Sequence, residues 1–392
     1  MTKHKIIFGD SRCLNEIEDK SVQLIITSPP YWQLKDYGSN NQIGFNDSYE
    51  EYINNLNLVW QECYRVLSDG CRLCINIGDQ FARSVYYGRY KVIPIRTEII
   101  RFCETLKMDY MGAIIWQKTT TMNTTGGGAV MGSFPYPRNG ILKMDYEFIL
   151  VFKKLGTAPK PTKEQKENSS MTKEEWSEYF SSHWHFNGVK QYEHIAMFPE
   201  ELPKRLIKMF SFIGETVFDP FAGSGTTLLA AKHLGRNSIG YEINKSFAPI
   251  IKNKLCEDSN LFECDSKLLF TEDKNENHTS FERLPYIFRD PHKMDKKIDI
   301  KKLQYGSTID GNVIKREELF SVKQVLSPER IELSNGLTVK LLGVKENKNY
   351  YQEAVEFLKT KFQKRRIFLR YDSIKYDSSN NLLSMLRADA IR

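Results

Sequence analysis

The sequence predicts an α/β protein, in which a sheet has helices on both faces, followed by a small α+β barrel. Over the first 270 residues, strand-like apolar runs alternate with segments of helical apolar spacing, which is typical of such a sheet. After a polar stretch, short alternating runs, a hairpin turn and one helix-like segment indicate the barrel. The length of 392 residues exceeds what one compact core usually holds and favours two domains.

The first domain is assigned to residues 1–270. Its predicted strands are short apolar runs, and they span Ile6–Phe8, Val22–Thr27, Arg72–Ile77, Met111–Trp116, Phe148–Phe152, Thr216–Phe218 and Asn237–Tyr241. Helical apolar spacing predicts helices over Tyr49–Leu67 and Ile93–Leu106. The polar stretch from Lys153 to Glu175 interrupts this pattern, so we expect an exposed insert at about residues 154–190.

The second domain is assigned to residues 301–392. The polar stretch Glu272–Ser280, with Pro285 and Pro291 after it, predicts a linker over residues 271–300. The predicted elements beyond the linker are strands at Arg330–Leu333, Thr338–Val344 and Arg366–Tyr371, a turn at Ser334–Gly336 and a helix at Tyr350–Phe362.

Bulk composition narrows the class of protein without specifying a reaction. No apolar run is long enough to span a bilayer, and the first residues carry no signal-peptide pattern, so we expect a cytoplasmic protein. A net charge of +7 suits a polyanionic partner. The seven cysteines are scattered, and Cys71 and Cys74 lie in an apparent buried strand, so we expect neither a disulfide framework nor a metal site.

A glycine-rich turn joins the strand ending at Phe218 to the helix Leu228–Leu234. It runs from Asp219 to Thr227 as DPFAGSGTT, and such a turn lets the backbone approach a ligand and points helix N–H groups at it. Glu242, after the next strand, could accept hydrogen bonds from ribose hydroxyls. A third glycine at dinucleotide spacing and a phosphate-binding lysine are both missing, which argues against dinucleotides and nucleoside triphosphates.

A second turn follows the strand Val22–Ile26 and reads TSPPYW from Thr27 to Trp32. Its two prolines fix the backbone and remove two N–H donors, so carbonyl oxygens stay free to accept hydrogen bonds. With one hydroxyl and two aromatic rings beside them, this turn could hold an amino group and clamp a planar ring. For the segment alone, a rigid turn packed into the core is the simpler interpretation. The turn lies at a strand end, in a chain that also has the glycine-rich turn, and this favours the interpretation that it holds an amino group and a planar ring.

Together the two turns resemble those of DNA amino-methyltransferases that use S-adenosylmethionine, in the β class, where the catalytic motif precedes the cofactor motif. The resemblance extends over most of residues 5–250 and includes Gly9-Asp10, Ile115–Lys118, Tyr146–Phe148 and His194–Leu202. It implies a Rossmann-like methyltransferase sheet, S-adenosylmethionine as the methyl donor, S-adenosylhomocysteine as the product and no metal. The cofactor-binding residues that it implies are Asp10, Phe198, Pro199, Asp219, Phe221, Gly223, Gly225, Thr226 and Glu242.

The same resemblance implies catalytic roles for Ser28, Pro29, Pro30 and Tyr31 toward a base flipped out of double-stranded DNA. Tyr31 and Trp32 would stack on the base, while Ser28 Oγ and the Pro29 carbonyl accept its two amino hydrogens. Serine before the prolines is typical of cytosine-N4 members, whereas adenine-N6 members carry Asp or Asn, so the resemblance favours cytosine N4. Adenine N6 stays open as a target, as do methylation of RNA or protein amides and a catalytically silent DNA-binding scaffold.

The expected partners are double-stranded DNA and, if the enzyme serves restriction-modification, a cognate restriction endonuclease. A monomer and a homodimer are both open. In the β class, target recognition lies between the segments that match Tyr146-Glu147 and Phe198-Pro199. The insert falls there and carries Trp176, Tyr179, Trp184 and His185, for which base recognition and local core packing are both open interpretations.

Residues 325–386 weakly resemble the thermonuclease-like form of the OB barrel. The positions of its catalytic and calcium-binding residues are taken by Lys340, Lys345, Lys348 and Asn381, which leaves Glu329 as the one acidic candidate. Lysines cannot replace calcium-binding carboxylates, so we expect no nuclease activity. The basic run Lys364-Arg365-Arg366 is either a DNA-binding segment or a solvated surface.

Overall fold

The computed structural model describes residues 2–36, 38–39, 41–82, 84–89, 91–118, 135–136, 138, 140–142, 144–186, 198–256, 266–273, 280–292, 307–308, 319–334, 338–363, 365–370 and 382–388. The chain forms two compact units, Met1–Val313 and Ile314–Arg392. None of the described helices is both long enough and apolar enough to cross a membrane.

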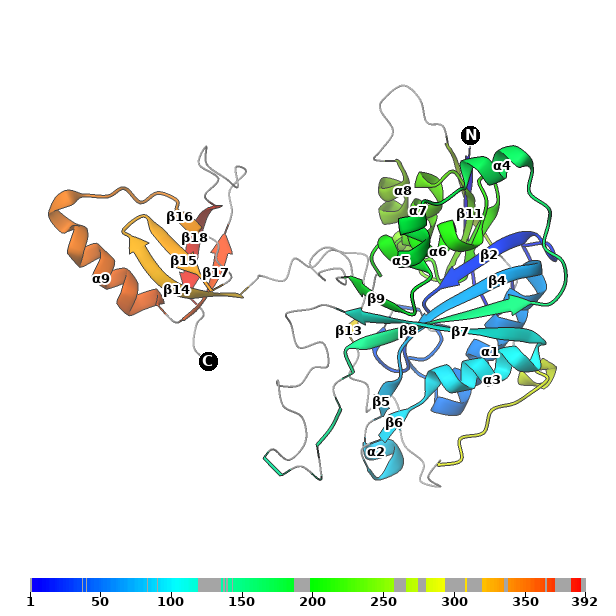
Figure 1. Ribbon diagram of the computed structural model, residues 1–392. Helices are drawn as coiled ribbons and strands as arrows, with labels where there is room; N and C mark the ends of the chain where they lie inside the picture. The colour runs from blue at the N-terminus through cyan, green and yellow to red at the C-terminus, as the bar shows by residue number, and fades with distance from the viewer. Residues whose placement is uncertain are drawn as a thin grey trace. The chain divides into compact units, whose positions relative to one another are not determined.

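A nine-stranded sheet forms the centre of the first unit (Figure 1). Its strands stand in the order β12-β1-β11-β10-β2-β4-β8-β7-β9. Their bounds are β1 (Thr2–Phe8), β2 (Val22–Thr27), β4 (Leu67–Ile77), β7 (Met108–Lys118), β8 (Tyr146–Lys154), β9 (His183–Phe186), β10 (Thr216–Asp219), β11 (Asn237–Glu242) and β12 (Ser266–Glu272). Every described pair is parallel except the two that β8 makes with β4 and β7. The other eight strands therefore end at one edge, the carboxyl edge, and β8 begins there. The opposite edge is the amino edge.

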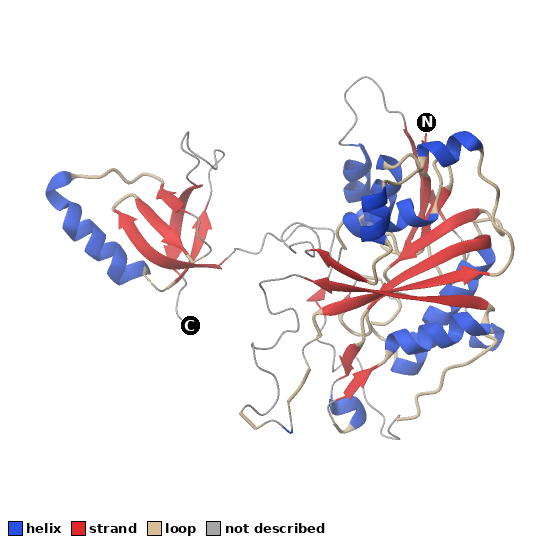
Figure 2. Ribbon diagram, in the orientation of Figure 1, coloured by secondary structure: helices blue, strands red, loops and turns tan. Residues whose placement is uncertain are grey.

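Helices cover both faces of this sheet (Figure 2). On one face lie α1 (Tyr49–Val66) and α3 (Ile95–Thr105), and on the other lie α6 (Glu201–Phe210), α7 (Thr226–His233) and α8 (Ala248–Cys256). A capping box begins α1, in which the side chains of Ser48 and Glu51 bind each other's backbone N–H groups. Adjacent residues of β2 point to opposite faces, because Ile25 packs with α1 and α3 whereas Leu24 and Ile26 pack with α6.

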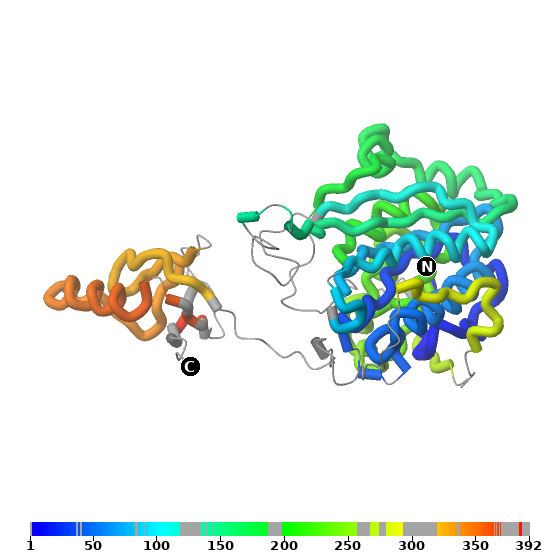
Figure 3. The backbone as a smooth tube through the Cα atoms, turned by 90° about the horizontal axis from the view of Figure 1, so that it is seen from below, coloured from blue at the N-terminus to red at the C-terminus, as the bar shows by residue number. Residues whose placement is uncertain are grey.

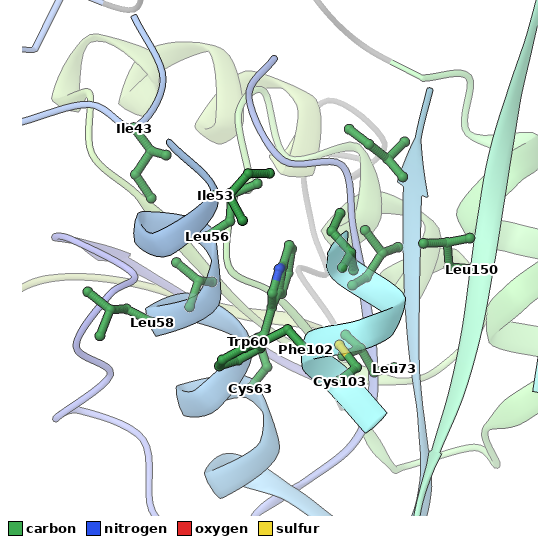
Figure 4. Packing of buried hydrophobic residues seen from close by; sticks show 14 of the residues in the cluster. Ile43, Ile53, Leu56, Leu58, Trp60, Cys63, Leu73, Phe102, Cys103 and Leu150 are labelled. Atoms are coloured by element: carbon green, nitrogen blue, oxygen red, sulfur yellow. The ribbon is translucent and has the colours of Figure 1, made fainter. Parts of the chain in front are cut away.

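The core between the sheet, α1 and α3 contains the fully buried Trp60 (Figure 4). Phe102 and Cys103 of α3 and Leu73 and Leu150 of the sheet belong to the same core and are also fully buried. Burying one large apolar side chain contributes about 1.5–3 kcal/mol. This core therefore holds α1 firmly against the strands whose ends carry the two turns.

Shorter elements complete the first unit: β3 (Lys35–Asp36), β5 (Gln80–Ala82), α2 (Ser84–Tyr87), β6 (Lys91–Ile93), α4 (Lys163–Asn168), α5 (Lys173–Tyr179), β13 (Ser307–Thr308) and the single-turn helices Lys245–Phe247 and Phe281–Arg283. Two small sheets arise from them, because β5 pairs with β6 in antiparallel and β3 pairs with β13 in parallel.

The predicted insert contributes to the core of the first unit. At its start, the side chains of Gln165 and Ser169 hydrogen-bond to the backbone of Ile213, just before β10, which places α4 at the amino edge. Further on, Tyr179 and Trp184 are 5% and 1% exposed and lie against the guanidinium of Arg205 on α6. These two aromatic residues are therefore core residues, and the hypothesis that they read a base is wrong.

The predicted linker over residues 271–300 is wrong in part. The described segment 280–292 packs beside α1, where Leu284 and Phe288 are 7% and 3% exposed (Figures 1 and 3). The side chain of Asn54 accepts a hydrogen bond from the N–H of Phe288 and donates one to its carbonyl. Two apolar anchors within a polar, proline-containing stretch thus tie this segment to the first unit, which continues to Val313.

All seven predicted strands of the first domain are confirmed, and β2 has the predicted bounds. The sequence did not predict β9, which has only four residues and lies inside the polar insert. It also did not predict β12, an edge strand that pairs only with β1 in the described sheet and leaves Leu269 and Phe270 partly exposed. Short length and one-sided burial leave little periodic signal in both strands.

The second unit is a closed five-stranded barrel with the strand order β14-β15-β16-β18-β17. Its elements are β14 (Leu319–Ser327), β15 (Arg330–Leu333), β16 (Thr338–Leu341), the single turn Lys348–Tyr350, α9 (Tyr351–Phe362), β17 (Arg366–Arg370) and β18 (Leu382–Ala388). β17 pairs with β14 to close the barrel, and β16 pairs in parallel with β18. Val322, Ile331, Leu333, Val339 and Ile367 fill its interior.

We predict that Phe288→Ala lowers the unfolding free energy of the first unit by about 3–5 kcal/mol, because it leaves a cavity beside α1. The neighbouring variant Ile287→Ala is the control, since Ile287 is 37% exposed and should lose less than about 1 kcal/mol. Urea unfolding monitored by tryptophan fluorescence measures both. Equal, small effects would mean that residues 280–292 behave as a linker after all.

Candidate functional site

The proline turn follows β2 at the carboxyl edge, and α1 anchors its backbone. Pro29 is buried, whereas Ser28 and Tyr31 are half-buried. The hydroxyl of Tyr52 on α1 donates a 2.9 Å hydrogen bond to the carbonyl oxygen of Pro30. This bond fixes the second proline, which has no N–H of its own to hold it in place. The turn is therefore rigid, with Ser28 and Tyr31 as its accessible side chains.

Three groups at the carboxyl edge hold the phenol of Tyr31 in place. Its hydroxyl accepts a 2.9 Å hydrogen bond from the N–H of Gly78 and donates a 3.0 Å bond to Glu147 Oε1. The other carboxylate oxygen of Glu147 accepts a 2.7 Å bond from Asn76 Nδ2. Burial and the nearby carboxylate raise the pKa of Tyr31 well above its ordinary value, so the phenol stays a donor. We call Tyr31, Gly78, Glu147 and Asn76 the tyrosine clamp.

Space is tight at Gly78. A Cβ atom there would lie 3.1 Å from the Tyr31 hydroxyl and 3.4 Å from Cγ of Glu147. Glycine at the end of β4 thus lets the phenol approach the backbone closely. The clamp fixes the tip of the ring from the ends of β4 and β8, the two strands that follow β2 on one side in the sheet.

Trp32 is buried in the core, which argues against the prediction that it stacks on a base. Its side chain is 2% exposed, and its Nε1 donates a 2.8 Å bond to the carbonyl of Asp47. Its ring packs against Tyr86 and Tyr49 at centroid distances of 4.8 and 5.6 Å. Trp32 therefore belongs to the core under the turn, and its indole N–H already has the partner that a buried tryptophan needs.

The glycine-rich turn presents its backbone to open space. Gly223 and Gly225 have φ angles of +51° and +80°, which favour glycine. A Cβ atom added at Gly223 would meet nothing within 4 Å, whereas one at Gly225 would lie 3.3 Å from Ile251. A side chain at position 225 would thus crowd Ile251, whereas the space over Gly223 is open and a ligand could approach the backbone there. Thr226 directly follows and begins α7, whose first N–H groups suit a polar ligand.

Asp219 joins the two turns. Its Oδ1 accepts hydrogen bonds from Thr27 Oγ1 at 2.8 Å and from the N–H of Phe221 at 3.0 Å, and its Oδ2 accepts one from Thr227 Oγ1 at 2.6 Å. Burial raises the pKa of this carboxyl to about 6. The side chain is only 1% exposed, so the prediction that Asp219 contacts a cofactor is wrong. Instead, Asp219 positions the residues that follow β2 and β10.

Glu242 and Asp10 lie at the ends of the neighbouring strands β11 and β1. The carboxylate of Glu242 accepts 2.8 Å hydrogen bonds from the N–H groups of Gly223 and Asn244, and burial raises its pKa to about 7. Asp10 is less buried and forms an ion pair with Arg12 at 2.5 Å. The structure thus brings Glu242 beside Gly223 and places Asp10 at the adjacent strand end.

Phe198 and Pro199 directly precede α6 and are half-buried, with Phe198 packed against the α6 core. Phe221 is also half-buried and meets the ring of Trp60 edge-on at 6.5 Å between centroids. These residues therefore lie against the two cores that flank the sheet.

Sequence reasoning missed three functional candidates. Glu147 follows Tyr146 within the resemblance, but only the fold shows that it binds Tyr31. Lys254 of α8 donates hydrogen bonds to Ser224 and Thr226 of the glycine-rich turn, and burial lowers its pKa to about 8. Tyr52 sits in an ordinary helical pattern. In each case the partner is far away in the sequence, so no local signal reveals the contact.

The predicted DNA-binding run Lys364-Arg365-Arg366 is only partly described. Lys364 lies outside the described residues, Arg365 is exposed, and the backbone of Arg366 begins β17. Of the barrel residues that replace nuclease positions, Lys340 lies on β16, Lys345 and Lys348 are exposed, and Asn381 lies outside the described residues.

Comparisons with known proteins agree with this geometry. A sequence profile of the DNA methylase family matches residues 22–253. The chain is 41% identical over 283 residues to the Type II methyltransferase M.MjaI of Methanocaldococcus jannaschii, covering 65% of this chain and 91% of that protein. It is 34% identical over 280 residues to the Type II methyltransferase M.MthZI of Methanothermobacter thermautotrophicus, covering 65% and 77%.

A solved structure is also similar. It is a putative DNA modification methylase from Thermus thermophilus in complex with S-adenosyl-L-methionine, with 35% identity and a TM-score of 0.55. The likeness covers 68% of this chain and 98% of that one. The family profile ends at residue 253, so the barrel lies outside the profile match.

The raised pKa of Glu242 predicts a pH dependence of stability. Its carboxyl has a pKa of about 7 when folded and about 4.5 when unfolded, so the folded state keeps a proton that the unfolded chain releases. The contribution to unfolding free energy is therefore fully present below about pH 4.5 and lost as pH rises to about 7, roughly 3 kcal/mol in all. Relative to the wild type, Glu242→Gln should gain stability over that range in urea unfolding. Glu164→Gln, on exposed α4, should show no such trend, and a flat difference for Glu242→Gln would contradict the prediction.

Proposed function

This chain belongs to the DNA methylase family and uses S-adenosylmethionine to methylate DNA, and from that premise we propose that its target is N4 of a cytosine in double-stranded DNA. The observation that carries the proposal is the side chain before the prolines. Ser28 offers a neutral hydroxyl at the end of β2, and the clamped ring of Tyr31 lies three residues on. Serine at this position is typical of the cytosine-N4 members that the turn resembles.

The residues of the glycine-rich turn fit S-adenosylmethionine. The space over Gly223 would let the ligand reach the backbone, and the buried carboxylate of Glu242 beside it suits ribose hydroxyls. In our proposal Phe221, Gly223, Gly225 and Thr226 line the cofactor, with Glu242 at the ribose and Asp10 toward the adenine. Phe198 and Pro199 would lie near its methionine end, and Lys254 would support Thr226 from behind.

Bound S-adenosylmethionine supplies a methyl group on a positively charged sulfur, so no covalent bond between enzyme and base is required. The work of the protein is to present the amino nitrogen. Ser28 Oγ and the Pro29 carbonyl would accept the two amino hydrogens, which draws the nitrogen lone pair out of conjugation with the ring. The fixed carbonyl of Pro30 and the clamped Tyr31 keep these acceptors and the stacking face aligned. Such positioning lowers the barrier without reorganisation at the moment of transfer.

A cytosine inside a duplex cannot reach this turn, so the base must be flipped out of the helix. Tyr31 would then stack on its face. Within the insert, α4 lies at the amino edge and Tyr179 and Trp184 are buried, which argues against base contacts by these parts, whereas Trp176 and His185 are exposed. In our proposal the exposed insert residues Trp176 and His185 stay the candidates for target recognition. The relatives are Type II methyltransferases, and a cognate restriction endonuclease is accordingly the expected companion.

For the second unit, the proposal is an OB fold without nuclease activity. A meander β14-β15-β16, the parallel pair β16–β18 and the closure of β17 on β14 support it. Lysines at 340, 345 and 348, where the resemblance expects catalytic and calcium-binding residues, argue against cleavage. Lys364, Arg365 and Arg366 would contact phosphates, and the exposure of Arg365 favours this.

The reacting base can be identified directly. DNA from a methylation-free host that expresses the protein, digested to nucleosides and analysed by mass spectrometry, should contain N4-methylcytosine. Expression of Ser28→Ala should abolish or strongly reduce that signal, since one acceptor for the amino group is lost. Detection of N6-methyladenine alone would overturn the cytosine assignment while leaving the methyltransferase fold untouched.

A double-mutant cycle tests the tyrosine clamp. Tyr31→Phe and Glu147→Ala each remove one side of the same hydrogen bond, so each should lower kcat/KM for DNA about tenfold or more. Because both variants lose the same interaction, the double variant should be no worse than the weaker single one. Glu147→Gln, which still accepts a hydrogen bond, should retain most activity, and S-adenosylmethionine affinity should stay unchanged in all four. Additive losses would show that Glu147 acts independently of Tyr31.

A further inference from the structure

Most of the net positive charge of this protein belongs to the barrel unit. Residues 314–392 contain 16 lysine and arginine residues against 10 aspartate and glutamate residues, a net charge of +6 out of +7 for the whole chain. The first unit, four times as long, has a net charge of only +1. Duplex DNA binding draws much of its affinity from the release of counterions by cationic side chains. The first unit has 40 lysine and arginine residues against 39 aspartate and glutamate residues, so the net positive charge available to a polyanion comes mainly from the barrel unit.

Cations gather on the outer face of β15 and β16. Along these strands, Ile331, Leu333, Val339 and Leu341 point inward and are buried. The alternate residues Arg330 and Lys340 stand directly opposite each other across the β15–β16 pair.

The same basic surface continues past the end of β16. Lys345 and Lys348 follow it and are exposed. Within the described part of the chain, Arg330, Lys345 and Lys348 make no ion pair. The three side chains are thus available to phosphate groups. We call Arg330, Lys340, Lys345 and Lys348 the barrel cations.

We propose that the barrel cations form a duplex-DNA contact surface that supplies most of the electrostatic affinity of this enzyme for DNA. The proposal rests on the proposed function, because the substrate that the catalytic unit needs is the polyanion that this face suits. β15 and β16 are the second and third strands of a closed five-stranded barrel, the face by which OB barrels bind nucleic acid. Closure leaves the barrel no free strand edge for another protein to extend.

The connection between the units makes this surface useful to catalysis. β13 pairs with β3, and β3 begins three residues after Trp32 in the proline turn, so Ser307 and Thr308 lie close in the fold to the segment that follows that turn. Only ten residues separate Thr308 from Leu319, the first residue of β14. A short connection raises the effective concentration of barrel-bound DNA at the catalytic unit, whatever orientation the barrel takes.

The test neutralises three barrel cations in the full-length protein as Arg330→Gln, Lys345→Gln and Lys348→Gln together. Affinity for a labelled duplex of arbitrary sequence is measured by fluorescence anisotropy over a range of KCl concentrations. Each lost phosphate contact flattens the plot of log affinity against log salt by about 0.9, so the triple variant should be about 2–3 flatter and bind roughly tenfold or more weakly at low salt. Its kcat at saturating DNA and its S-adenosylmethionine affinity should stay unchanged.

Two further variants make the test specific. Lys160→Gln, Lys166→Gln and Lys173→Gln remove the same charge from exposed positions of the insert and should leave affinity and slope unaltered. Arg330→Lys with Lys345→Arg and Lys348→Arg keeps the charge and should keep the affinity, which excludes loss of folding as the cause. An unchanged slope in the barrel variant, or equal losses in the insert variant, overturns the proposal and favours a protein partner for this face. Failure of the proposed function would instead appear as no methyl transfer by the wild type to any DNA.

Discussion

The buried carboxylate of Asp219 is the interaction on which the site depends. It binds Thr27 at the end of β2 and both Phe221 and Thr227 in the glycine-rich turn, so two turns 192 residues apart share one acceptor. A carboxylate without solvent is stable only while its donors remain in place. The catalytic turn and the cofactor turn are therefore assembled together, and neither can shift without leaving a buried charge unsatisfied.

Around that carboxylate, the protein separates positioning from binding. Hydrogen bonds from α1, β4 and β8 hold Pro30 and Tyr31, and the cores on both faces of the sheet keep those elements fixed. Most of the net positive charge of the chain belongs to the other unit. Positioning Pro30 and Tyr31 requires buried, rigid surroundings. Phosphate contacts work best when they are exposed and hydrated. A chain with two units can meet both requirements.

Local pattern was enough to predict seven of the nine strands of the large sheet and the two turns at strand ends, because these depend on short-range periodicity and on backbone constraints of glycine and proline. It failed where burial depends on distant partners. Trp32 is buried by Tyr49 and Tyr86, and Phe288 is held by Asn54, 234 residues before it. The sequence predicted that Asp219 contacts a ligand, because it belongs to the glycine-rich turn. Its carboxylate instead accepts a hydrogen bond from Thr27. The sequence assigned no role to Glu147, and only the placement of β8 in the fold shows that its carboxylate contacts Tyr31.

The reversed direction of β8 has a consequence for how such an enzyme diversifies. Glu147 reaches the carboxyl edge from within a strand, paired across to Trp116 of β7, rather than from a loop. Insertions and deletions accumulate in loops and are rarely tolerated inside a sheet. Loops around the site can therefore change in length and composition while Glu147 stays in register with Trp116 and keeps its hydrogen bond to Tyr31. New specificities can evolve on this scaffold without a new chemical centre.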